Sequence, residues 1–166
     1  DPLNAAIIKG LEDEQSLEIL ATGLNPTVIF PEVLTLSVAE CSEVNAFYDS
    51  DANEIIMCAE LLTFLYDAYY PYVLTEEELY QVIDGTFMYF FYHEVGHALI
   101  DILDLPTTGR EEDAVDQLAA LVLLEADYPE YLEAAVSFFV MTGQDQMSAS
   151  WDAPLWDAHS LDMQRA

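Results

Sequence analysis

The stretch YFFYHEVGHALIDIL (residues 89–103) decides the fold. It contains the motif HEVGH at positions 93–97, and the turn of a helix places the two histidines about 40° apart on one face. Apolar side chains surround the motif, so this helix is expected to be buried nearly all round. Two histidines and a glutamate are costly there unless they bind something. We therefore expect His93 and His97 to bind one Zn²⁺, with Glu94 beside it as a general base.

A tetrahedral catalytic zinc needs a third protein ligand. After the loop at 105–109, a second predicted helix carries Glu112 and Asp116 about 40° apart on its apolar stripe. Buried carboxylates require a cation or a hydrogen-bond donor. The pattern predicts Glu112 as the third ligand and Asp116 as the acceptor of a ligand imidazole N–H. Glu111 and Asp113 fall to either side of the stripe and are expected to be solvated.

The rest of the chain predicts an α+β fold, a small antiparallel sheet of two to three strands followed by a mostly helical half. Residues 14–24 have helical spacing, whereas 27–60 are rich in β-branched and alternating residues with turn formers at 49–53. Further helices are expected at 58–69, 75–103, 110–126 and 129–141, and a break in the second of these is considered near Gly85.

Length and composition limit the classes of function. The chain has 166 residues, 53% of them apolar, which fits one domain spanning residues 1–166. Its formal net charge of −29 excludes nucleic acid as a favourable partner, because the phosphate backbone would be repelled. The longest apolar region, 79–103, is interrupted by Asp84, His93, Glu94 and Asp101, so no membrane span is predicted. The sequence does not indicate an oligomeric state.

Cys41 and Cys58 are the two cysteines, and their count alone allows either a disulfide or two buried thiols. A hairpin turning at 49–53 would bring them near one another, which favours the disulfide. A disulfide would place the protein in the periplasm or outside the cell, whereas two thiols would suit a cytosolic enzyme. The sequence does not begin with a basic region followed by an apolar stretch. We therefore expect that a targeting peptide was removed or was never present.

The HEVGH motif followed by E-x-x-x-D on a second helix resembles the gluzincin zinc metallopeptidases, and the short chain with strands before the active-site helix is similar to the minimal gluzincins. A closer resemblance is to a bacterial family described as "putative metallopeptidases" of unknown function. It is carried by CSEVNAFYD (41–49), NEIIMCAELL (53–62), HEVGHALIDILDLPTTGREEDAVDQLAALVLL (93–124) and WDAHSLDMQR (156–165).

The resemblance implies a zincin core with His93, His97 and Glu112 as ligands of one zinc and Asp116 beside a ligand histidine. It supports the disulfide, and it implies that the strand at 53–57 is the edge on which an extended peptide substrate would lie. It also implies a tyrosine or histidine that stabilises the oxyanion. His159 is the candidate, with Tyr128 and Tyr131 as alternatives.

The predicted function is hydrolysis of peptide bonds by a zinc-bound water that Glu94 activates. The alternative is a zinc-stabilised binding or regulatory domain without proteolytic activity. A non-catalytic domain has no reason to keep a carboxylate next to its first ligand, so Glu94 distinguishes the two. A third hypothesis is a cytoplasmic protease that degrades regulators. Two features argue against it: the sequence has no DNA-binding module, and the expected disulfide does not suit the cytoplasm.

Overall fold

The computed structural model describes residues 1–149, with side chains to residue 143, and has the predicted α+β fold. Its helices are α1 (Pro2–Asp13), α2 (Ser16–Leu24), α3 (Ala59–Tyr69), α4 (Glu76–Ile102), α5 (Glu111–Glu125) and α6 (Pro129–Ala149). Its strands are β1 (Thr35–Ala39), β2 (Ala46–Asp49) and β3 (Glu54–Cys58). The small sheet followed by a mostly helical half is confirmed.

The sheet is mixed, which corrects the expectation of an antiparallel one. Its order is β1-β3-β2, with β2 antiparallel to β3 and β1 parallel to it. The predicted turn at 49–53 joins β2 to β3, and there the Asp49 carboxylate accepts hydrogen bonds from the backbone N–H groups of Asp51 and Ala52. After β1 the chain crosses the end of the sheet and forms β2 at the far edge. It then turns back, and β3 fills the place between β1 and β2, parallel to β1.

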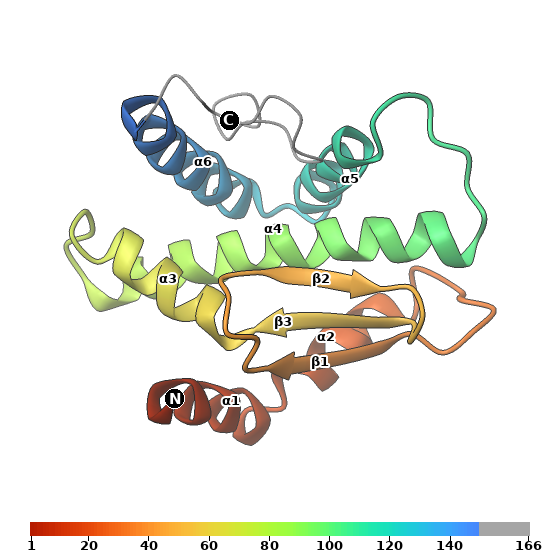
Figure 1. Cartoon of the computed structure of the whole chain (residues 1–166), viewed down its shortest axis with the longest axis horizontal. Helices are drawn as coiled ribbons and strands as arrows, with labels where there is room; N and C mark the ends of the chain where they lie inside the picture. The colour runs from red at the N-terminus through yellow and green to blue at the C-terminus, as the bar shows by residue number, and fades with distance from the viewer. Residues whose placement is uncertain (150–166) are drawn as a thin grey trace.

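Helix α4 is the centre of the fold. Figure 1 shows it running between the sheet on one side and α5 and α6 on the other. The predicted burial is confirmed around the motif, because residues 85–100 are all buried or half-buried, whereas Asp101 and most of the first two turns of α4 are exposed. The helix is unbroken at Gly85. Two glycines allow the neighbouring helices to approach closely. A Cβ at Gly85 would lie 2.7 Å from the Tyr131 Cα on α6, and one at Gly96 would lie 2.7 Å from the Val115 Cγ1 on α5.

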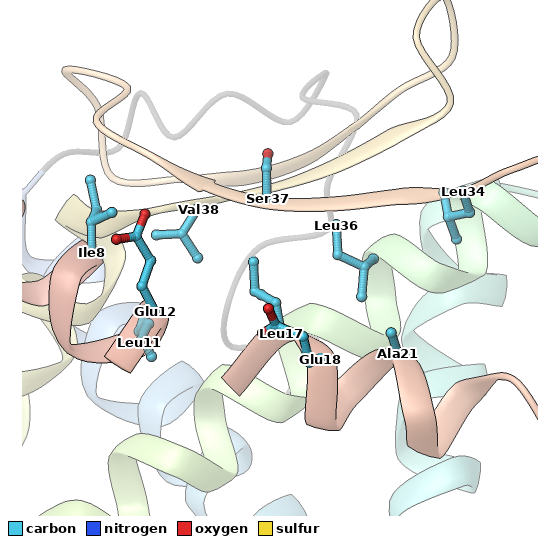
Figure 2. A pocket seen from close by; sticks show the side chains of 10 residues that line it. All are labelled: Ile8, Leu11, Glu12, Leu17, Glu18, Ala21, Leu34, Leu36, Ser37 and Val38. Carbon is cyan, nitrogen blue, oxygen red and sulfur yellow. The ribbon is translucent and has the colours of Figure 1, made fainter. Parts of the chain in front are cut away.

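Helix α1 was not predicted, although its start has a clear signal. The Asp1 carboxylate accepts a hydrogen bond from the Leu3 backbone N–H at 2.7 Å, and Pro2 occupies the first turn, where its missing N–H costs nothing. Between α1, α2 and β1 lies an open, mostly apolar groove, in which Leu36 of β1 faces α2 and Val38 points between α1 and α2 (Figure 2). None of its lining residues belongs to the HEVGH motif.

A disulfide joins Cys41 to Cys58, as predicted, with a Cα–Cα distance of 5.5 Å. It ties the segment between β1 and β2 to the end of β3. The Glu60 carboxylate also holds this segment, because it accepts hydrogen bonds from the backbone N–H groups of Cys41 and Ser42. The disulfide and the Glu60 carboxylate therefore both restrain the segment that leads into β2. No helix in residues 1–149 is long and apolar enough to cross a membrane.

Candidate metal centre

The fold brings His93, His97 and Glu112 together. The two histidines lie one turn apart on α4, and Glu112 reaches them from the first turn of α5. The close packing of Val115 on Gly96 sets the separation of the two helices at this point. One ligand atom from each of the three side chains lies within 4.8 Å of the others. These are the three residues that the sequence predicts as metal ligands.

The donor set fits a tetrahedral zinc ion. The Nε2 atoms of His93 and His97 are 3.2 Å apart, and they lie 3.2 and 3.5 Å from the two carboxylate oxygens of Glu112. Zinc–nitrogen and zinc–oxygen bonds of about 2.0–2.2 Å at tetrahedral angles separate neighbouring ligand atoms by about 3.3–3.5 Å. The two nitrogens are therefore close to the separation that a shared zinc ion requires, and each lies near a different oxygen of Glu112.

Each histidine is oriented by a second carboxylate. The Asp116 Oδ1 lies 2.8 Å from the Nδ1 of His93, and the Glu111 Oε1 lies 2.7 Å from the Nδ1 of His97. Because an ionised carboxylate only accepts hydrogen bonds, Nδ1 carries the proton in both rings. Both Nε2 atoms then face each other and Glu112, where a metal ion could bind them.

The contact of Glu111 was not predicted. Its side chain is 45% exposed, which agrees with the expected solvation, yet its carboxylate bonds a ligand candidate. Helical spacing could not reveal this contact, because it depends on how α5 lies across α4.

The environment shifts the pKa values of two groups. Burial by itself lowers the pKa of His93, but hydrogen bonds to Asp116 and Glu112 outweigh it and raise that pKa to about 9 when no metal is bound. A metal ion at Nε2 would therefore displace a proton at neutral pH. Glu94 is only 6% exposed, and this burial raises the pKa of its carboxyl group to about 7. A carboxyl group with a pKa near neutrality can both accept and release a proton.

A cleft of about 440 Å³ opens beside the three candidate ligands. It is bounded by β2 and its flanks, by α4 and by the start of α5. The lining residues are Asn45, Ala46, Phe47, Tyr48, Ser50, Glu94, His97, Ile100, Asp101, Glu111 and Glu112. The contribution of residues 45–50 was not predicted from the sequence.

The edge strand at this cleft is β2, which corrects the implied role of residues 53–57, because β3 is the central strand. The Cys58 N–H bonds the Asn45 carbonyl, and hydrogen-bonded pairs alternate along an antiparallel ladder. The backbone groups of Ala46 and Tyr48 therefore point away from β3. In agreement, the Glu94 carboxylate accepts a hydrogen bond from the Tyr48 backbone N–H.

Of the predicted oxyanion stabilisers, the two alternatives Tyr128 and Tyr131 are not brought to this cleft. His159 lies outside the described residues. Tyr128 and Tyr131 stack on each other with ring centroids 5.1 Å apart, and neither lines the cleft. Tyr131 instead packs against Gly85, about two turns of α4 before His93.

One comparison with known proteins, the match to a family model, agrees with this geometry. The family model DUF4344, described as "Putative metallopeptidase", matches residues 1–166. Neither the search of curated proteins nor that of solved structures finds a match. The family model covers the whole chain, and the chain belongs to this family.

Proposed function

We propose that this member of the metallopeptidase family is a zinc-dependent peptidase in which His93, His97 and Glu112 hold one Zn²⁺ and Glu94 is the general base. The observation that carries the proposal is the convergence of two Nε2 atoms and a carboxylate, at zinc spacing, beside an open cleft. Zn²⁺ bound there would act as a Lewis acid that polarises the scissile carbonyl and makes water more acidic.

Glu94 performs the proton transfers. Its carboxylate accepts the proton of the attacking water and then gives it to the departing amine. Its burial supports this role, because a pKa of about 7 lets the same group work in both directions. The Tyr48 N–H hydrogen-bonds the carboxylate and so limits its orientation.

The substrate lies along β2. The outward backbone groups of Ala46 and the outward carbonyl of Tyr48 offer hydrogen bonds to an extended peptide. The disulfide between Cys41 and Cys58 restrains the approach to this strand. Because a stable disulfide requires an oxidising compartment, we place the protein in the periplasm or outside the cell.

The second candidate function is a binding or regulatory domain that zinc stabilises. The same three ligand candidates support it. Glu94 argues against it, because an ionisable carboxyl group at a site 6% exposed is costly and a structural zinc gains nothing from it.

Peptide cleavage by wild type and Glu94→Gln tests the proposal. Both proteins are loaded with zinc, their metal content is measured, and a peptide library is digested and read by mass spectrometry. We expect equal zinc in the two proteins and a rate at least about a hundredfold lower for Glu94→Gln. Zinc-loaded wild type that cleaves no peptide would favour the binding domain instead.

A further inference from the structure

We propose that the cleft selects peptides with a lysine or arginine within two residues of the scissile bond, and that Asp101 is the residue that determines this preference. The inference rests on the proposed function, because it concerns the substrate of the same site. Its starting point is the chemical character of the cleft wall. Four of the lining residues are acidic, and none of the described lining residues is a lysine or an arginine.

The acidic residues of the cleft have different partners. Glu112 and Glu111 contact the histidines, and Glu94 accepts the Tyr48 N–H. Asp101 lies beside a neutral hydroxyl instead, because the Tyr48 O–H is 2.9 Å from its Oδ2 and is shared with the Oδ1 of Asn53, also at 2.9 Å. That bond leaves the Asp101 carboxylate its full negative charge. Burial first, and then the hydrogen bond to Asp101 and the charge of Asp101, raise the pKa of Tyr48 to about 12, so the phenol stays protonated as the donor.

The position of Asp101 sets which substrate residue it meets. It follows His97 by one helical turn on the same face of α4, a rise of about 6 Å along the helix. An extended peptide advances about 3.3 Å per residue. A peptide lying along β2 with its scissile bond at the metal centre therefore presents a side chain near Asp101 within about two residues of that bond.

The charge of the whole molecule acts in the same direction. The chain carries a net charge of −29, so a cationic peptide is attracted and an acidic one is repelled before either reaches the cleft. This general attraction raises the association rate of any cationic peptide. The side chain at Asp101 adds a preference that depends on position, which distinguishes the two effects.

The experiment uses one peptide series, in which a single position is scanned as Lys, norleucine or Glu, from two residues before to two residues after the cleaved bond. We expect wild type to have a kcat/KM ratio of Lys to Glu of about fivefold or more at one position. In Asp101→Asn this ratio falls to the value shared by the other scanned positions, which reflects the general attraction alone, and in Asp101→Lys it falls below that value. The asparagine keeps an oxygen that accepts the Tyr48 O–H, so β2 stays in place.

Asp67→Asn is the matched control, because Asp67 is an exposed acid on α3 that does not line the cleft. It changes the net charge by the same amount and is expected to keep the wild-type ratio. Equal rates for Lys and Glu peptides at every position, or an Asp101→Lys variant with the wild-type ratio, would overturn the inference.

A binding measurement separates this inference from the proposed function. Fluorescence anisotropy of the labelled Lys and Glu peptides on zinc-loaded Glu94→Gln reports selectivity without turnover. Tighter binding of the Lys peptide that depends on Asp101, with no cleavage by wild type, would refute the peptidase and keep the charge selectivity. Cleavage by wild type without any charge preference would keep the peptidase and refute the charge selectivity.

Discussion

Replacing Gly96 by alanine should separate α4 from α5, the two helices that carry the proposed metal ligands. The added Cβ would lie 2.7 Å from the Val115 Cγ1 and 2.8 Å from the Val115 Cβ. Carbon atoms in contact are about 3.5 Å or more apart, so α5 must withdraw from α4 by about 0.8 Å. Rotation of the valine moves Cγ1 but leaves its Cβ in place. The helix itself must shift.

The shift matters because Glu112 lies one turn before Val115 on α5. A metal site tolerates displacements of about 0.5 Å in its ligands. We expect Gly96→Ala to cost about 1–3 kcal/mol of folding free energy through overpacking, and to lower zinc affinity about 10–100-fold. Denaturant unfolding of the metal-free protein measures the first quantity, and competition with a zinc chelator measures the second.

Gly85→Ala is the matched control on the same helix. Its Cβ would also meet an atom at 2.7 Å, but that atom is the Tyr131 Cα on α6, away from the ligands. It should lose stability to a similar extent and keep wild-type zinc affinity while folded. If the two variants bind zinc equally well, the spacing of α4 and α5 does not position Glu112.

Three further predictions follow from named contacts. Glu111→Ala should weaken zinc binding about tenfold, because the contact between its carboxylate and the Nδ1 of His97 is lost, whereas Asp113→Asn removes an equal charge from the same turn and should not; equal losses would indicate a general charge effect. Burial raises the pKa of Glu94 from about 4.5 to about 7, so its contribution to the stability of the metal-free protein is present below pH 4.5 and is lost as pH rises through 7. Between pH 5 and pH 8, with a chelator present, Glu94→Gln should therefore gain about 2–3 kcal/mol of unfolding free energy relative to wild type. A difference between the two proteins that does not change with pH would contradict the burial argument. Reduction of Cys41–Cys58 should lower the free energy of unfolding by about 3 kcal/mol, measured with and without reductant, and two titratable thiols in the unreduced, denatured protein would show that no disulfide forms.

The sequence predicted those features that a local period encodes. The burial of α4, the face shared by His93 and His97, and the apolar stripe that carries Glu112 all follow from a repeat of 3.6 residues. The turn at 49–53 was predictable because Asp and Asn side chains hydrogen-bond their own backbone.

Other features depend on contacts between segments far apart in the chain. The parallel pairing of β1 with β3 is decided by where the chain crosses the sheet, which no alternation of residues records. The contact of Glu111 with His97 and the place of Tyr48 beside Glu94 result from the packing of α5 and β2 on α4. Helix α1 is different, since its Asp-Pro start is a local signal that could have been used.

Native mass spectrometry of the purified protein tests the proposed metal centre most directly. One zinc ion per chain is expected for wild type after addition of zinc, retained in Glu94→Gln and bound about tenfold or more weakly in Glu112→Ala, because only the second variant loses a ligand. A folded wild-type chain that takes up no zinc would refute the centre formed by His93, His97 and Glu112, and with it the peptidase.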